Sequence, residues 1–377
     1  MNRFMDSLGA AHFAMSDGLS RTQAGILDMF GFGPNERAFQ IISSGPHCRL
    51  RRYDGPDAAM PLLIVAAPIK RPYIWDLTPA VSAVGYCLDH GLRVYLLEWM
   101  SAADGDGRAG LDEYAGEAIT ACVKAVSADA RQARPFLMGH SLGGTLAAIS
   151  CALEPQMARG LVLLGAPLCF ERASSRFRDA LVSMVPSTLA ETGMVPGSLL
   201  SRASVAASLE TFLWSRWVDG LLSLADPSAM DTHARIERWA LDEVALPAKL
   251  VSQIAQWLYS ENRFYRGTLS VRGRTVGPSD LRTPTLAVVN TADEIGPLAS
   301  VLPFFGKMPI PDTQAIECPA EVGVAMQHLA VLAGRQAFAR VWPQIISWLQ
   351  AHSEAATKEP AADQALPQTA SSLRYRD

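Results

Sequence analysis

Residues Phe136 to Ala148 read FLMGHSLGGTLAA and contain the most informative turn in the chain. The first residues are apolar enough for a short buried strand, and the last are small enough for a closely packed helix. Between them lies Gly139-His140-Ser141-Leu142-Gly143, a G-x-S-x-G turn. A chain that reverses over one residue strains the serine backbone and leaves no room for a Cβ at either glycine. The pattern predicts an exposed Ser141 hydroxyl, followed by a helix whose first amide, on Leu142, points toward a developing oxyanion.

A G-x-S-x-G sequence also arises by chance, and in that case it marks a glycine-rich turn whose serine has no catalytic role. The surroundings favour a nucleophile, because an apolar strand precedes the turn and an Ala/Thr-rich helix follows it. Strand and helix patterns alternate around it, which predicts a parallel sheet covered on both faces. The predicted fold class is therefore α/β, with an α/β-hydrolase fold. The expected strands are 39–42, 48–53, 62–66, 94–97, 136–140, 161–164, 285–289 and 314–316, and the expected helices include 82–89 and 111–126.

The alternation stops after residue 167 and resumes near residue 281. Residues 168–280 lack the strand rhythm and predict a largely helical cap, placed where α/β-hydrolases carry one. We expect most of the cap's aromatic side chains to pack in its core. The predicted division is an N-terminal helical and strand extension (1–56), the first part of the core (57–167), the cap (168–280), the second part of the core (281–351) and a disordered tail (352–377). An amphipathic helix is expected within residues 1–30.

Composition excludes several classes of function. The 377 residues carry a net charge of −4, which gives no basic footprint for nucleic acid. No apolar run approaches the length of a membrane span, and the first thirty residues lack a signal-peptide core. The six scattered cysteines form no CxxC pair, so we expect buried, reduced thiols rather than disulfides or a zinc site. These features favour a cytoplasmic protein with no metal and no cofactor.

A serine nucleophile needs a base to take its proton and an acid to orient that base. The chain order in α/β-hydrolases is Ser, then Asp or Glu, then His. That order excludes the histidines up to His140, while His233 lies in the cap before any good acid candidate and His352 lies at the edge of the tail. His328 remains, which follows the strand 314–316 and precedes the last helix. Asp293 lies just past the strand 285–289, at the sheet edge where site residues gather. Asp293 is the predicted acid, with the adjacent Glu294 as the alternative.

A second oxyanion donor is expected in the loop after the first core strand, Ala66-Ala67-Pro68-Ile69-Lys70-Arg71-Pro72. The prolines have no N–H to donate. We therefore select the Ile69 amide, with the Ala67 amide as the alternative. Lys70 and Arg71 in this loop have two interpretations: they contact an anionic substrate group such as a CoA phosphate, or they form a solvated basic pair.

Several stretches together resemble the polyhydroxyalkanoate synthase family. They cover residues 60–350, and the matches within the cap are the most specific ones. The family places its acid and its base where Asp293 and His328 lie. The resemblance implies an acyl-CoA or acyl ester substrate, a hydroxyalkanoate polymer as substrate or product, and dimerisation through the cap. The matching stretches are 72–79 (PYIWDLTP), 89–99 (DHGLRVYLLEW), 235–242 (RIERWALD), 258–264 (LYSENRF) with 267–269 (GTL), and 293–297 (DEIGP).

Two residues depart from the family pattern. The synthases carry cysteine at the turn, where this chain has Ser141. A cysteine acyl-enzyme is a thioester and exchanges readily with a CoA thioester, whereas a serine acyl-enzyme is an ordinary ester that activated water can resolve. Ser141 therefore favours hydrolysis or simple acyl transfer over polymerisation. Gln327 stands where the family has glycine before the histidine, which affects the local loop.

Three functions follow from these observations. The first is a serine hydrolase that cleaves an ester or thioester of a hydroxyacyl or fatty acyl unit, with Ser141, His328 and Asp293 as its triad. The second is a synthase-like acyltransferase that moves 3-hydroxyacyl groups from CoA to a hydroxyl. The third is a non-catalytic paralogue that binds polymer granules or a synthase.

Overall fold

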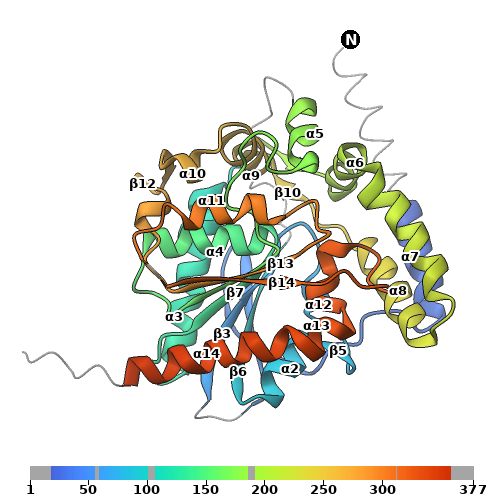
Figure 1. Ribbon diagram of the computed structural model, residues 1–377, viewed down its shortest axis with the longest axis horizontal. Helices are drawn as coiled ribbons and strands as arrows, with labels where there is room; N and C mark the ends of the chain where they lie inside the picture. The colour runs from blue at the N-terminus through green and yellow to red at the C-terminus, as the bar shows by residue number, and fades with distance from the viewer. Residues whose placement is uncertain (1–17, 56–58, 101–106, 186–191, 311, 358–377) are drawn as a thin grey trace, which may run out of the picture.

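The computed structural model describes residues 18–55, 59–100, 107–185, 192–310 and 312–357. An eight-stranded sheet in the order β1-β2-β6-β3-β7-β8-β13-β14 crosses the molecule (Figure 1). The strands from β6 to β14 are parallel, while β1 and β2 add an antiparallel edge. The bounds are β1 Phe39–Ser44, β2 Cys48–Tyr53, β3 Met60–Val65, β6 Leu92–Trp99, β7 Phe136–His140, β8 Leu161–Leu164, β13 Thr285–Asn290 and β14 Thr313–Cys318. The predicted α/β-hydrolase architecture is confirmed.

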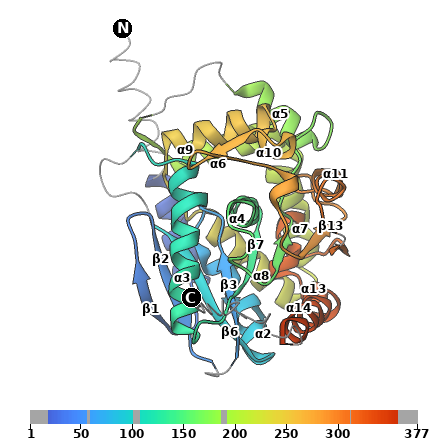
Figure 2. The same cartoon turned by 90° about the vertical axis from the view of Figure 1, so that its left-hand side faces the viewer.

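The central strands of the sheet are buried on both faces, and β3 (MPLLIV) and β8 (LVLL) are accordingly apolar along almost their whole length. The first face packs against α3 (Ile119–Asp129) and α4 (Leu142–Leu153), and the second against α2 (Ala83–Asp89), α12 (Ala330–Ala333) and α14 (Trp342–Thr357) (Figures 1 and 2). The expected helix 111–126 begins as a wide π-helical segment, η2 (Asp112–Ala118), and continues as α3. Shorter elements are η1 (Pro72–Trp75), β4 (Asp76–Thr78), β5 (Val81–Ser82), η5 (Pro278–Asp280), η6 (Leu298–Ser300), α11 (Leu302–Phe305), η7 (Gln327–Leu329) and α13 (Arg335–Arg340).

The segment after β8 is largely helical, as the missing strand rhythm predicts, and α5, α9 and α10 lie above α4 (Figures 1 and 2). Two short antiparallel pairs within it carry no signal in the sequence: β9 (Met194–Val195) with β10 (Leu246–Pro247), and β11 (Leu269–Val271) with β12 (Arg274–Val276). The helices are α5 (Arg176–Met184), α6 (Gly197–Ala207), η3 (Glu210–Trp214), α7 (Ser215–Ser223), α8 (Pro227–Ala240), α9 (Ala248–Gln253), η4 (Ile254–Ser260) and α10 (Arg263–Arg266).

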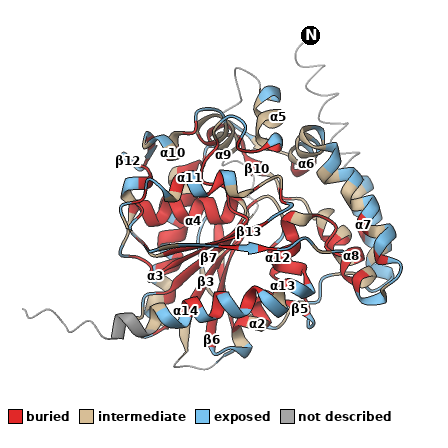
Figure 3. Ribbon diagram, in the orientation of Figure 1, coloured by how far each residue is buried: buried red, intermediate tan, exposed pale blue. Residues whose placement is uncertain are grey.

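The aromatic side chains of the cap range from buried to highly exposed. Phe264 and Trp239 are buried, as expected for core packing, whereas Trp214 and Trp217 are 69% and 68% exposed. Both exposed tryptophans lie on η3 and α7, the outermost helical segment of the cap (Figure 3). That segment turns its apolar side away from the protein.

The two ends of the chain follow the sequence prediction only in part. Residues 18–29 are helical, while residues 1–17 of the expected N-terminal helix lie outside the described residues. At the other end, α14 continues through Thr357, beyond the predicted start of the tail at residue 352. The reason is local, because 352–357 (HSEAAT) contains no proline or glycine and extends the preceding helix. Residues 358–377 lie outside the described residues.

Candidate active site

Ser141 occupies the sharp turn between β7 and α4, with φ 54° and ψ −134°. Glycine on either side is required sterically: a Cβ at Gly143 would lie 2.3 Å from the Val65 carbonyl oxygen, and one at Gly139 would lie 2.5 Å from Gly144 Cα. The Ser141 amide donates to the Leu164 carbonyl at 3.0 Å, which ties the turn to the end of β8. The predicted strand, turn and helix are therefore present, and Leu142 is the first residue of α4.

His328 and Asp293 meet beside this turn. The His328 Nδ1 hydrogen donates to Asp293 Oδ2 at 2.7 Å, and the residues are only 7% and 5% exposed. Both pack over Gly165, where a Cβ would lie 3.1 Å from Asp293 Oδ2 and 3.3 Å from His328 Cε1. Gly165 directly follows Leu164, whose carbonyl accepts from the Ser141 amide. The ends of β7, β8 and β13 therefore bring Ser141, Gly165 and Asp293 close to one another, and His328 lies with them.

The surroundings of Asp293 favour its ionised form although the residue is buried. Burial opposes ionisation of Asp293, but His328 and hydrogen bonds from His328, Ile295 and Gly296 hold the pKa of this carboxyl below its usual value. Within the described part of the chain, the buried His328 Nε2 has no hydrogen-bond partner. With Nδ1 protonated and directed at Asp293, Nε2 carries the lone pair that a general base needs.

Glu294, the alternative acid, has different partners. Its carboxylate accepts from Thr211 Oγ1 at 2.7 Å and Ser208 Oγ at 3.1 Å, both in the cap. The structure thus assigns the two adjacent carboxylates separately, with Asp293 on the imidazole and Glu294 on the cap.

His140 is a site residue that the sequence argument excluded, because it precedes the serine. Its Nε2 hydrogen donates to the His328 carbonyl at 2.8 Å, and the two rings lie 4.5 Å apart. Burial, followed by repulsion from His328, lowers the pKa of His140 to about 3. His140 is therefore a neutral donor that supports the His328 backbone. His140 stands at an x position of G-x-S-x-G, where the pattern sets no residue, so the sequence gave no indication of this role.

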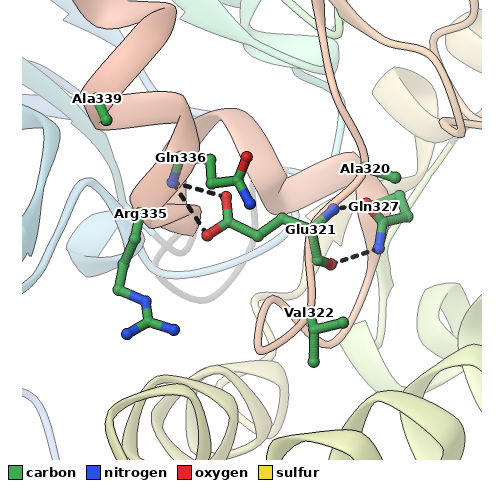
Figure 4. Close-up of a pocket in the computed structure, with 7 residues that line it drawn as sticks. All are labelled: Ala320, Glu321, Val322, Gln327, Arg335, Gln336 and Ala339. Carbon is green, nitrogen blue, oxygen red and sulfur yellow. Dashed lines mark hydrogen bonds between the residues drawn. The ribbon is translucent and has the colours of Figure 1, made fainter. Parts of the chain in front are cut away.

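Gln327 closes the loop that carries His328. Its Nε2 donates to the Glu321 carbonyl at 2.8 Å and its Oε1 accepts from the Glu321 amide at 3.0 Å (Figure 4). The Glu321 carboxylate in turn accepts from the Gln336 amide. Gln327 therefore gives this loop a cross-link that glycine would lack.

The predicted oxyanion loop lies between α4 and the cap. The Ala66 carbonyl oxygen would be 2.8 Å from a Cβ at Gly143, so this loop passes the first turn of α4. The Ile69 carbonyl accepts from the Val244 amide of the cap at 3.3 Å. The Ile69 amide, or alternatively that of Ala67, stays a prediction for the second oxyanion donor, as the Leu142 amide does for the first.

Lys70 is not part of a solvated basic pair, and this interpretation is wrong. Its Nζ donates to the Ala240 carbonyl and to Ser201 Oγ at 3.2 Å, and lies 3.5 Å from Glu243 Oε1. Burial, partly offset by Glu243, lowers the pKa of Lys70 to about 8. Its amine faces the cap because the cap covers this loop, while Arg71 is exposed.

All six cysteines are free and buried, and the burial agrees with the sequence prediction. Among the described residues, no group of three or more His, Cys, Asp and Glu side chains could hold a metal ion. No helix in the described ranges is both long and apolar enough to span a membrane.

The sheet order, the strained serine and the adjacent His–Asp pair define an α/β-hydrolase. Residues 78–318 match the alpha/beta hydrolase fold family, and the chain belongs to it. Poly(3-hydroxyalkanoate) polymerase subunit PhaC of Haloferax mediterranei is 28% identical over 87% of this chain and 66% of its own length. PhaC of Allochromatium vinosum is 27% identical over 82% of this chain and 87% of its own length. These matches confirm the resemblance to polyhydroxyalkanoate synthases.

The chain spans 66% of the length of the Haloferax mediterranei relative and of another from Haloarcula marismortui, which is 25% identical. Among solved structures, monoacylglycerol lipase of Paleococcus ferrophilus aligns with a TM-score of 0.51 at 16% identity, over 81% of this chain and 99% of its own. A structure from a study of Nitrososphaera gargenis carboxylesterases aligns with a TM-score of 0.52 at 14% identity, over 84% and 100%. These structures share the fold.

Proposed function

We propose that this chain is a serine hydrolase that cleaves an ester or thioester of a hydroxyacyl or fatty acyl unit through an acyl-Ser141 intermediate. One observation carries the proposal. His328 donates Nδ1–H to the buried Asp293 while its Nε2 has no partner among the described residues, beside a serine held at positive φ. A serine hydroxyl at such a turn, with an imidazole oriented by a carboxylate, is the arrangement that acyl transfer requires.

In the proposed reaction, Ser141 Oγ attacks the acyl carbonyl carbon and His328 Nε2 accepts the hydroxyl proton. Asp293 stabilises the resulting imidazolium, and the amides of Leu142 and Ile69, or Ala67, hold the oxyanion. Collapse expels the alcohol or thiol, which takes the proton from His328. Water, deprotonated by His328, then attacks the acyl-serine. The second collapse returns the proton to Ser141 Oγ and releases the free acid.

The oxygen nucleophile favours water as the final acceptor. Transfer of an acyl group from a CoA thioester to serine is downhill, because an ester is more stable than a thioester. An acyl-serine has therefore lost the driving force with which a cysteine thioester acylates the next hydroxyl. Hydrolysis needs only that His328 activate a water molecule.

The alternative function is a synthase-like acyltransferase that uses 3-hydroxyacyl-CoA. The observation that favours it is the similarity to proteins named poly(3-hydroxyalkanoate) polymerase subunit PhaC, which extends over 82–87% of this chain in three of them. In this reaction a hydroxyl of the growing chain, instead of water, attacks the acyl-serine. The same resemblance leads us to propose a homodimer formed through the cap.

A panel of acyl esters and acyl-CoAs, including 3-hydroxybutyryl-CoA, tests the proposal when the products are identified by mass spectrometry. We expect free acid from the purified protein and none from the Ser141→Ala variant. Polymer or a new ester as the main product would favour the transferase. Turnover that survives Ser141→Ala would overturn both functions. A fluorophosphonate probe that labels Ser141 would argue against the non-catalytic paralogue.

A further inference from the structure

Helix α7 turns a polar side toward the rest of the protein. Its buried residues are Asp219 and Ser223, while Trp217, Leu221 and Leu222 are exposed. The helix is therefore not held by burial of its apolar residues, although it forms part of the cap. Asp219 is 7% exposed, and an ionised carboxylate at such a position must be compensated by donors.

The donors that reach Asp219 come from the segment that carries His328. The Gly323 amide donates to Asp219 Oδ1 at 2.8 Å, and the Ala325 amide donates to Oδ2 at 2.8 Å. The third donor is His233 of α8, whose Nδ1 lies 2.7 Å from Oδ2. One carboxylate of the cap thus binds two backbone amides at positions that shortly precede His328.

This segment needs outside support. Gly323 has φ +92°, and Ala325 has φ +56°, a conformation that L-residues other than glycine rarely adopt. The two amides are buried by the cap, so without the carboxylate they would lose their hydrogen bonds. Gln327 links the segment to Glu321 at its other end. Asp219 is the corresponding support from the cap.

We infer that Asp219 is a positioning residue for the reaction: through Gly323 and Ala325 it holds the segment that places His328 Nε2 against Ser141. His233 has a supporting role, because it orients the Asp219 carboxylate. The inference rests on the proposed function, since it assigns His328 as the base. It adds that the position of the cap determines the position of the base. A base displaced by about 1 Å loses on the order of 100-fold in rate.

The test is the Asp219→Asn variant. Its side-chain oxygen can still accept from one of the two backbone amides, but its NH₂ group faces the other amide, so that two donors oppose each other. The matched control is Asp231→Asn, because Asp231 pairs with Arg235 one turn further along α8 and its side chain has no hydrogen bond with Asp219, His233 or residues 319–328. Three quantities are measured for each protein: the rate of fluorophosphonate labelling of Ser141, the kcat per titrated site with its KM, and hydrogen exchange at the amides of Gly323 and Ala325.

For Asp219→Asn we expect labelling and kcat per titrated site to fall about 100-fold, with KM changed by less than about threefold. Exchange at the two amides should accelerate, while Asp231→Asn should match the wild type in all three readouts. Counting titrated sites separates this effect from simple unfolding, which lowers the number of sites but not the rate of each. If Asp219→Asn does not fold, His233→Phe removes the third donor instead, and a smaller change in the same direction is expected.

Two results would overturn the inference: unchanged exchange at Gly323 and Ala325, or faster exchange with an unchanged rate per site. An unlabelled wild type would instead overturn the proposed function. A labelled wild type whose Asp219→Asn variant labels equally fast overturns only the role of Asp219.

Discussion

In the proposed mechanism, Nδ1 of His328 binds Asp293 and Nε2 transfers the proton. This arrangement can be disturbed without changing the size of any side chain. In Asp293→Asn, the amide group can present its NH₂ to Nδ1, which then becomes the acceptor and moves the ring proton to Nε2. We expect kcat to fall about 10⁴-fold, as for the loss of the carboxylate in other serine triads. Steady-state kinetics per titrated site measure this effect. A decrease of less than tenfold would contradict the role of Asp293.

The same carboxylate predicts how stability depends on acid. The pKa of Asp293 is lower in the native state than in the unfolded chain, despite the opposing effect of burial. The ionised form therefore stabilises the native state above the unfolded pKa of about 4, and this contribution is lost as the pH falls through the lower native value. Urea unfolding at several pH values should show the wild type losing its advantage over Asp293→Asn below about pH 4. An advantage that stays constant with pH would contradict it.

A further prediction at the scale of single residues concerns Gln327. Replacement by glycine removes both hydrogen bonds to Glu321 and adds backbone freedom immediately before His328. We expect the free energy of unfolding to fall by about 1–3 kcal/mol and kcat per titrated site to fall with it. Urea unfolding and active-site titration measure the two effects. Gln336→Ala is the control, because Gln327, Glu321 and Gln336 line one pocket, the Gln336 side chain is exposed, and its backbone amide keeps the bond to the Glu321 carboxylate (Figure 4). Equal effects of the two substitutions would refute the assignment.

The elements differ in how far the sequence predicted them. Strands β3, β7 and β8 were predictable because buried parallel strands are continuous apolar runs bounded by turn residues. The turn at Ser141 was predictable because the contacts of Gly139 and Gly143 exclude any Cβ. Helix α7 was not, since its exposed residues are the apolar ones and its buried residues are Asp219 and Ser223. Periodicity predicts the opposite orientation, so a reading of the sequence alone also misses Asp219.

The contact between the oxyanion loop and the cap can be tested through Lys70. Burial lowers the pKa of Lys70 to about 8 in the native state, so between about pH 8 and 10.5 the unfolded chain binds more protons. The free energy of unfolding should therefore rise with pH in this range, by at most about 1.4 kcal/mol per pH unit. Comparing the wild type with Lys70→Met by urea unfolding isolates this contribution from other titrating groups. Parallel pH profiles of the two proteins would show that Lys70 is not the source.

Taken together, three hydrogen bonds between cap and core fall on loops that the proposed mechanism uses. Lys70 of the proposed oxyanion loop binds the Ala240 carbonyl, Glu294 beside the proposed acid binds Thr211, and Asp219 binds the segment before the proposed base. These hydrogen bonds come in addition to apolar packing, because Ile236 and Trp239 of α8 lie in one core cluster and Leu250 and Leu258 lie in the other. A displacement of the cap would therefore reach these three loops through both kinds of contact.

The outer surface of the cap leads to a prediction for the assembly. Trp214, Trp217 and Leu221 are 69%, 68% and 64% exposed along η3 and α7, so large apolar side chains gather on the outer surface of the cap. If the proposed dimer forms through the cap, this surface lies in the interface, and a charge at its centre should separate the subunits. We expect the mass from light scattering to fall by half in Trp217→Glu, while Leu302→Glu, at an exposed leucine of α11, should keep the wild-type mass.

Labelling of Ser141 is a second readout of the same variants. Because the Trp217 side chain has no hydrogen bond with residues 319–328, the labelling rate per subunit should not change in Trp217→Glu. A wild type that is monomeric at micromolar concentration would contradict the proposed dimer and leave this surface for another partner.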